Sequence, residues 1–303
     1  MTESQTPMRQ DRLWRMEAWA YDFAHFLAHL FPIEAVSDFG GWVGRTFGPL
    51  TSAHRVAETN LRIVFPNADG PEIKRLLRAQ WDEFGRWLAE FPILDRIVAE
   101  PERVEVEGME RLTALNGKHP AVLISGHFSN FEVMALAIMR AGVECQVTYR
   151  ATNNPYFNER VVTGRRAYGV KMFAPKGTSG AREMFRAIAR GESIALMNDQ
   201  KFNGGIAAPL FGRLAYTAPG PSTYALHFGI PIQPMSVQRT GPARFKVTVH
   251  EPFRLQDTGD RDADIEAAVR RINAFMEERV LARPTEWFWV HKRWPNETYR
   301  RAA

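Results

Sequence analysis

The sequence contains a single cysteine, Cys145, among its 303 residues. One thiol cannot form an internal disulfide framework or a cysteine-rich metal site, and this usage is typical of a reducing compartment. Cys145 lies in the segment "GVECQVTYR", which reads as the start of a β-strand. We therefore interpret it as a buried structural thiol and not as a nucleophile.

Long apolar runs are also absent. No window approaches the roughly 18 to 20 uncharged apolar residues that a membrane-spanning helix needs. The first eight residues, "MTESQTPM", are polar, and the arginines that follow them do not lead into an apolar core with a small-residue cleavage site. We expect a chain that has no secretory signal and stays inside the cell.

The chain has a basic excess but no basic block. Its net charge of +5 is carried mostly by arginines that are scattered along the sequence. Because we find neither a long Lys/Arg run nor a nucleic-acid motif, we expect no nucleic-acid partner. An anionic membrane surface or a phosphorylated substrate is the partner that this charge favours.

Residues 1–95 are expected to form a helical segment that associates with membranes. Within it, residues 14–34 place Trp19, Phe23 and Phe26 at helical spacing, while Asp22 and two histidines interrupt the apolar pattern. Such an amphipathic helix is too polar to span a bilayer. It can pack on the protein's own core or lie in the membrane interface, and the many large aromatic side chains favour the membrane.

Residues 96–303 change in character, because strand-type and helical segments alternate from there on. The strand-type segments include "AVLIS", "ESIALMND" and "RFKVTVHEPF". This alternation predicts an α/β fold, with a mixed sheet flanked by helices and an N-terminal helical arm. No repeat or low-complexity linker separates the two parts, so we expect one compact unit.

The stretch "AVLISGHFSNFEVMALA", residues 121–137, is the strongest indication of a site. His127 follows a continuous apolar strand, and the carboxyl ends of strands in α/β sheets are where ligands and reactive groups collect. Ser129 and Asn130 are suited to cap the helix that follows. Glu132 is five residues from His127, a spacing that on a straight helix points the two side chains apart. They can meet only if His127 lies in a loop before the helix.

A carboxylate that holds one ring nitrogen of a histidine fixes its tautomer and makes the other nitrogen a better base. His127 could then take a proton from a hydroxyl group, and no protein nucleophile would be needed. The alternative is a loop histidine that is satisfied by a backbone carbonyl. Asp199 follows the apolar run "SIALM" and is therefore expected at the carboxyl end of another strand.

The segment "GHFSNFE" resembles the His-x4-Asp/Glu signature of the lysophospholipid/glycerolipid acyltransferase superfamily, in particular its late lipid A (lauroyl/myristoyl) acyltransferase branch. Further segments resemble that branch in the same order, over nearly the whole chain. They are "AETNLRIVFP" (57–66), "YRATNNP" (149–155), "MNDQ" (197–200), "PLFGRLAYTAPGPSTYAL" (209–226), "GIPIQPM" (229–235) and "PTEWFWVHKRW" (284–294).

The resemblance implies roles for six residues. His127 would be the general base and Glu132 its partner. Arg165 and Asp199 correspond to a polar pair around the same pocket. Arg150 and Asn153 match a "YR-x-x-N" segment, where an arginine would suit a phosphate or the developing oxyanion.

The resemblance also implies the reaction. An acyl chain would move from acyl-acyl carrier protein, or from coenzyme A, to a hydroxyl group of a lipid A precursor, with no cofactor and no metal. Other glycolipids, such as a phosphatidylinositol mannoside, and lysophospholipids are alternative acceptors. A metal-assisted hydrolase using His127, Glu132 and Asp199 is a further alternative, but no His-Glu-x-x-His spacing supports it. A membrane-surface binding protein without enzymatic activity is the third.

The resemblance places the protein at the cytoplasmic face of the bacterial inner membrane. Members of the branch usually carry a longer and more hydrophobic N-terminal segment, whereas here Asp22, His25 and His29 interrupt it. We therefore expect peripheral or monotopic attachment.

Overall fold

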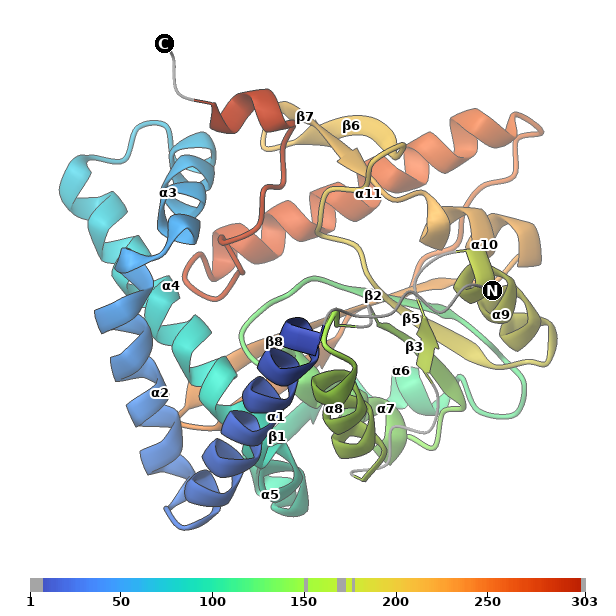
Figure 1. Ribbon diagram of the computed structural model, residues 1–303. Coiled ribbons are helices and arrows are strands. Elements are labelled where there is room, and N and C mark those ends of the chain that lie inside the picture. The colour runs from blue at the N-terminus through green and yellow to red at the C-terminus, as the bar shows by residue number, and fades with distance from the viewer. Residues whose placement is uncertain (1–7, 150–151, 168–172, 176–177, 301–303) are drawn as a thin grey trace.

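A computed structural model describes residues 8–149, 152–167, 173–175 and 178–300 (Figure 1). Its N-terminal part is helical, as predicted. The helices there are α1 (Met8–His29), α2 (Ile33–Phe47), α3 (Ser52–Val64), α4 (Gly70–Glu90) and α5 (Leu94–Ala99), with 3-10 turns η1 (Gly48–Leu50), η2 (Phe91–Ile93) and η3 (Pro101–Arg103).

The rest of the chain forms a sheet with flanking helices, which confirms the predicted α/β class. The strands are β1 (Val104–Glu107), β2 (Val122–Ser125), β3 (Cys145–Tyr149), β4 (Phe173–Pro175), β5 (Ser193–Met197), β6 (Ile206–Leu210), β7 (Arg213–Thr217), β8 (Ile232–Gly241) and β9 (Arg244–Val249). The helices are α6 (Met109–Thr113), α7 (Met134–Arg140), α8 (Pro155–Ala167), α9 (Thr178–Ala189), α10 (Gly220–Phe228) and α11 (Arg261–Ala282), with 3-10 turns η4 (Phe131–Val133) and η5 (Asn296–Tyr299).

The main sheet has the strand order β1-β9-β8-β2-β5-β3-β4. Neighbouring strands are parallel except β8 and β9, which form an antiparallel pair, so the sheet is mixed. Strands β6 and β7 form a separate antiparallel hairpin that the sequence did not reveal. In Figure 1 the helices α2, α3 and α4 gather at the left, α1 is seen between α2 and α8, and α11 crosses above the sheet.

The register between β2 and β5 positions the site. These two parallel strands pair Ser125 with Met197 at their carboxyl ends. The backbone N–H of Asn198 donates to the carbonyl of Ser125 at 2.9 Å and continues the pairing for one more residue. Whatever follows β2 must therefore lie beside whatever follows β5.

The N-terminal helices share their core with the sheet. A single cluster of buried apolar side chains includes Ile33, Leu61 and Leu76 from these helices and Leu123 and Val247 from the strands. The helical part up to residue 95 and the part that follows it therefore share one core. Among the described residues, no helix is both long enough and apolar enough to cross a membrane.

Helices α2 and α4 approach each other unusually closely, at glycines. A Cβ atom on Gly44 would lie 2.0 Å from the carbonyl oxygen of Trp81 and 2.9 Å from the Cα of Gly85. A Cβ on Gly85 would in turn lie 2.2 Å from the carbonyl oxygen of Gly40. These are contacts with backbone, which cannot rotate away.

Gly44→Ala should therefore destabilise the protein by about 1 to 3 kcal/mol, because α2 must move away from α4. The matched control is Gly164→Ala on α8, where an added Cβ meets nothing within 4 Å. The control should keep or raise the melting temperature, because alanine favours helix by up to about 1 kcal/mol over glycine. Thermal unfolding of both variants is the measurement, and equal melting temperatures would contradict the close packing.

Candidate active site

His127 and Asp199 meet at the carboxyl edge of the sheet. Each lies two residues beyond its strand, β2 for His127 and β5 for Asp199, and the register of these strands brings them together. The Nδ1 atom of His127 is 2.7 Å from Oδ1 of Asp199. A carboxylate at this distance accepts a hydrogen bond from a protonated Nδ1, and the neutral ring then keeps a lone pair on Nε2. A histidine held in this way can act as a general base.

Asp199 is itself held in place by two further donors. Its Oδ2 accepts the backbone N–H of His127 at 2.8 Å and the indole N–H of Trp287 at 2.8 Å. Burial by itself raises the pKa of this carboxyl group, but attraction by His127 and these hydrogen bonds outweigh burial and hold the pKa below its usual range. Asp199 is therefore an anion at neutral pH.

The loop that carries His127 is fixed by the segment after α11. The backbone N–H of Phe288 donates to the carbonyl of His127 at 3.1 Å, and that of Ser129 donates to the carbonyl of Glu286 at 2.7 Å. Phe128 and Trp287 form a β-bridge between the two segments. Ser129 is fully buried with φ of +43°, a left-handed conformation that needs such support.

Aromatic rings enclose the imidazole. The ring of Phe131 lies edge-on to that of His127, with centroids 4.8 Å apart, and Phe288 follows at 6.1 Å. The ring of His291 is also 6.1 Å away. The His127 side chain nevertheless remains 15% exposed, so a substrate can reach it from one side.

Glu132 lies in η4 and forms an ion pair with Arg165 of α8. The Nε of Arg165 donates to Oε2 of Glu132 at 3.0 Å, and its Nη2 donates to Oε1. This pairing differs from the expected one, in which Glu132 held His127. The sheet register supplies Asp199 at that position, while Glu132 is carried by the next turn toward α8. Arg165 and Asp199, expected as a pair, therefore bind separate partners.

Of the two remaining residues implied by the resemblance, Asn153 makes no described contact with His127. Arg150 lies outside the described residues. Asn153 is exposed in the loop before α8. Its neighbour Asn154 is buried and caps α8, because its Oδ1 accepts the backbone N–H of Tyr156 at 3.0 Å.

A buried network of charged groups lies beneath the His127 loop. Arg239 of β8 donates to Glu83 at 2.8 Å and to Glu90 at 2.5 and 3.1 Å, both on α4. Burial lowers the pKa of Arg239, but attraction by Glu90 and Glu83 outweighs it, so the pKa lies above its usual range. Asn130 donates to Glu90 at 2.9 Å and Ser129 to Glu83 at 3.3 Å. The two residues expected as helix caps therefore anchor the loop to α4 instead.

Glu286 lies beside this network, and the pKa of its carboxyl group is raised. Its side chain is 5% exposed, and its Oε2 has no hydrogen-bond partner among the described residues. Burial and the nearby Glu83 carboxylate raise the pKa of Glu286 to about 7. Sequence reasoning missed Glu286, Trp287 and Arg239, since each acts through contacts between segments far apart in the chain.

Within the described part of the chain, no cluster of three or more His, Cys, Asp or Glu side chains is arranged to hold a metal ion. The site offers a base, an anion that orients it and a partly open face. Such an arrangement is chemically able to remove a proton from a hydroxyl group.

The model of the bacterial lipid A biosynthesis acyltransferase family matches residues 1–296, and the chain therefore belongs to that family. Membership confirms the predicted resemblance and identifies the protein as an O-acyltransferase of the lipid A biosynthesis type. Among curated proteins, no match to the chain is found.

Glu286 predicts how the stability of the protein depends on pH. A carboxyl group whose pKa rises from 4.5 to about 7 on folding makes the folded state bind more protons between these values, so stability falls as pH rises through this window. The glutamine in Glu286→Gln cannot ionise. The variant should therefore keep roughly 2 to 3 kcal/mol of the free energy of unfolding that the wild type loses as the pH rises through this window. Unfolding in denaturant at pH 5 and pH 8 is the measurement.

We expect Glu286→Gln to be more stable than the wild type at pH 8 and similar to it at pH 5. The exposed Glu297 serves as the control position, and Glu297→Gln should leave the pH dependence unchanged. A Glu286→Gln variant with the same pH dependence as the wild type would show that the Glu286 carboxyl ionises normally.

Proposed function

We propose that the protein transfers a fatty acyl chain from acyl-acyl carrier protein to a hydroxyl group of a lipid A precursor, with His127 as the general base. The observation that carries the proposal is the 2.7 Å contact between His127 Nδ1 and Asp199 Oδ1, which leaves Nε2 available to the acceptor. In this proposal Asp199 takes the orienting role that the sequence motif suggested for Glu132.

The reaction follows from that geometry. His127 Nε2 takes the proton of the acceptor hydroxyl as its oxygen attacks the thioester carbonyl carbon of the donor. The new C–O bond gives a tetrahedral intermediate, the C–S bond then breaks, and the departing thiolate receives the proton from His127. Asp199 stays ionised throughout and stabilises the imidazolium that forms in between. No acyl-enzyme is needed.

Glu132 acts as a positioning residue in this account. Its side chain is 7% exposed and its partner Arg165 is 18% exposed, so the ion pair is largely removed from water. The pair fixes the turn directly after Phe131, whose ring contacts the imidazole. Removing the carboxylate would break this ion pair with the largely buried Arg165 guanidinium and loosen the turn.

The charge of the chain supports an acidic donor protein. With a net charge of +5, the protein attracts acyl carrier proteins, which are acidic, and anionic glycolipids over a range set by the salt concentration. Coenzyme A carries phosphates and is the alternative donor. Transfer assays that supply each donor by itself distinguish them.

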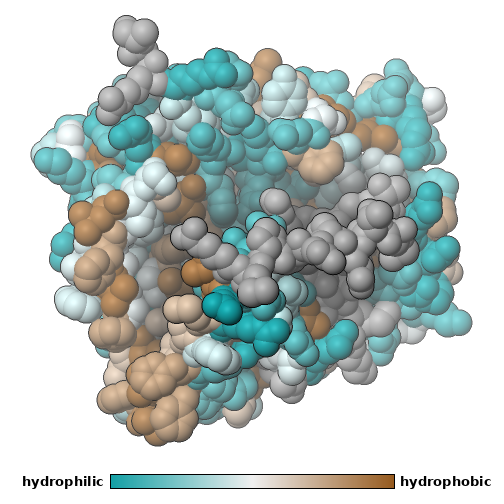
Figure 2. Space-filling view, viewed as in Figure 1, coloured by the Kyte–Doolittle hydropathy of each residue, from teal (hydrophilic) through white to brown (hydrophobic). Residues whose placement is uncertain are grey.

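A second feature supports activity at the cytoplasmic surface of the inner membrane. The outer face of α1 exposes Trp19 (67%), Phe23 (62%) and Phe26 (60%), and α2 adds Phe39 and Trp42, whose rings stack at 5.7 Å. Figure 2 shows hydrophobic side chains gathered at the lower left, over the region where α1 and α2 join. Exposed aromatic side chains on neighbouring helices are typical of a surface that enters the interface of a bilayer.

His127→Ala and Asp199→Asn should each lower kcat by a factor on the order of a hundred or more. An asparagine at position 199 presents an amide donor to Nδ1, which forces the proton onto Nε2, so the histidine can no longer accept one. The measurement is transfer from labelled acyl-acyl carrier protein to a tetra-acylated lipid A precursor in detergent. Asp262→Asn, the same change at an exposed position on α11, is the control.

Full activity in both His127→Ala and Asp199→Asn would show that the base lies elsewhere. An inactive wild type that is soundly folded would overturn the proposed donor and acceptor. Glu132→Gln separates the two candidate partners of His127. A loss in Glu132→Gln with an unaffected Asp199→Asn would restore the motif-based assignment.

The membrane proposal predicts that Trp19→Ser combined with Phe23→Ser weakens binding to vesicles of phosphatidylethanolamine and phosphatidylglycerol by at least about tenfold, because two large apolar side chains no longer leave water. Co-sedimentation with the vesicles measures this. The control combines Leu214→Ser and Tyr216→Ser, two exposed residues on β7. Equal loss of binding in both pairs of variants would argue against a specific membrane face.

A further inference from the structure

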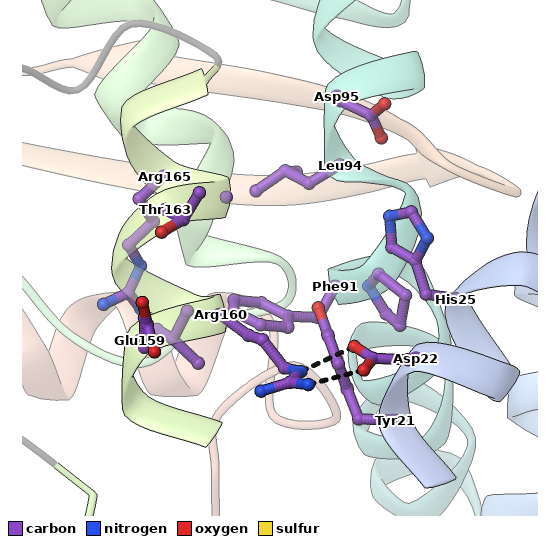
Figure 3. Close-up of a pocket in the computed structure, with 13 residues that line it drawn as sticks. Tyr21, Asp22, His25, Phe91, Leu94, Asp95, Glu159, Arg160, Thr163 and Arg165 are labelled. Atoms are coloured by element: carbon purple, nitrogen blue, oxygen red, sulfur yellow. Dashed lines mark hydrogen bonds and ion pairs between the residues drawn. The ribbon is translucent and has the colours of Figure 1, made fainter. Parts of the chain in front are cut away.

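A cavity lies between α1, the segment from Phe91 to Asp95, and α8 (Figure 3). Its volume is about 570 Å³. This falls within the range of about 300 to 1,000 Å³ that is usual for sites of small molecules. The cavity is therefore large enough to enclose a substantial part of a substrate.

The cavity wall combines aromatic and charged groups. Tyr21 extends across it toward Phe91, and Leu94 and Val161 add apolar surface. Burial and the carboxylates of Asp22 and Asp95 raise the pKa of the Tyr21 hydroxyl to about 12, so this group remains a neutral donor. Six acidic, basic or histidine side chains also line the cavity: Asp22, His25, Asp95, Glu159, Arg160 and Arg165.

The side chains of the cavity wall would interact differently with the acyl chains and with the saccharide of a glycolipid. An alkyl chain in the cavity would remove these polar groups from water and offer them no hydrogen bonds, which is unfavourable. A saccharide has hydroxyl groups that bond to carboxylates and guanidinium groups, and C–H faces that pack on aromatic rings. A phosphorylated sugar would in addition meet Arg160 and Arg165.

Arg165 connects the cavity to the loop of His127. Arg165 forms part of the cavity wall, lies over the ring of Phe91 with its guanidinium carbon 5.8 Å from the ring centre, and pairs with Glu132. Glu132 directly follows Phe131, whose ring contacts the imidazole of His127. A ligand in the cavity is therefore connected to the His127 loop through Arg165 and Glu132.

The cavity is also linked to the proposed membrane face, through α1. Tyr21 and Asp22 face the cavity, while Trp19 and Phe23 of the same helix are exposed on its outer surface. Asp22 fixes this orientation by accepting hydrogen bonds from Arg160 of α8 at 2.6 and 2.5 Å, drawn as dashed lines in Figure 3. A lipid anchored in the bilayer beside α1 can thus present its headgroup to the cavity.

We propose that the cavity between α1 and α8 binds the saccharide headgroup of the acceptor glycolipid. The inference rests on the proposed acyltransferase function, since it assigns a place to that reaction's acceptor. Bound in this way, the headgroup lies beside Arg165 and directs a hydroxyl group toward His127, while its acyl chains remain with the membrane.

Thr163→Trp tests the proposal by filling the cavity. Thr163 is an exposed residue of the cavity wall, so a larger side chain can be accommodated without disturbing the core. We expect KM for the lipid A precursor to rise by at least about tenfold, with kcat and the KM for acyl-acyl carrier protein nearly unchanged, since only acceptor binding is impaired. Thr113→Trp on α6, also exposed, is the matched control and should behave as the wild type.

A titration without turnover makes the test independent of the reaction. The probe is the deacylated, bisphosphorylated glucosamine disaccharide, followed by calorimetry. It should bind the wild type and Thr113→Trp and fail to bind Thr163→Trp.

A parallel titration with decanoate reports on an acyl-chain site. If the disaccharide binds Thr163→Trp as it binds the wild type, or if Thr163→Trp loses binding of decanoate and keeps that of the disaccharide, the cavity does not hold the headgroup and the proposal is overturned. Transfer by the wild type with an unaltered acceptor KM in Thr163→Trp overturns the headgroup site alone. Absence of transfer in the wild type overturns the proposed function, and the titration then still decides the site.

Discussion

The pairing of two parallel strands in register is the constraint on which the site depends. Because β2 and β5 end at Ser125 and Met197 side by side, the residues two positions beyond them, His127 and Asp199, must be neighbours. A slip of one residue would turn one of these side chains to the other face. The backbone N–H of His127 binds the same carboxylate as its ring does, so the main chain and the side chain enforce one geometry.

Charges buried beneath the loop hold this geometry against the helical part of the chain. Arg239 is 7% exposed and Glu90 is fully buried, and isolated groups of this kind would be strongly unfavourable. Each is compensated by several hydrogen bonds, including those from Ser37 and Asn130 to Glu90. Loss of one partner leaves the other charge uncompensated, so these contacts join α4, β8 and the His127 loop into one cooperative unit.

Much of the fold could be predicted from the sequence, because apolar periodicity is a local signal. The strands at "AVLIS" and "SIALM" and the helix that contains Trp19 and Phe23 lie where they were expected. The hairpin of β6 and β7 was missed, since β6 contains a proline and neither strand shows a regular alternation of apolar and polar residues. The exposed aromatic pair Phe39 and Trp42 was also missed, because helical spacing alone does not show which face another helix covers.

The sequence predicted which residues follow the strands at the site better than it predicted which of them bind one another. His127 and Asp199 were both placed at strand ends, yet the order of strands in the sheet, which the sequence does not state, decides that they meet. The family resemblance implied Glu132 as the partner, whereas a 3-10 turn carries Glu132 to Arg165. Trp287 and Arg239 join the site from distant segments, and no local pattern marks them.

The nitrogen NMR spectrum of His127 tests the central claim most directly. In wild-type protein labelled at the histidine nitrogens, the account predicts that the neutral ring carries its proton on Nδ1, where Asp199 accepts it, and that Nε2 is bare. This assignment should hold in the absence of any substrate. A neutral ring with its proton on Nε2 would contradict the account, because such a histidine could not take a proton from the acceptor hydroxyl.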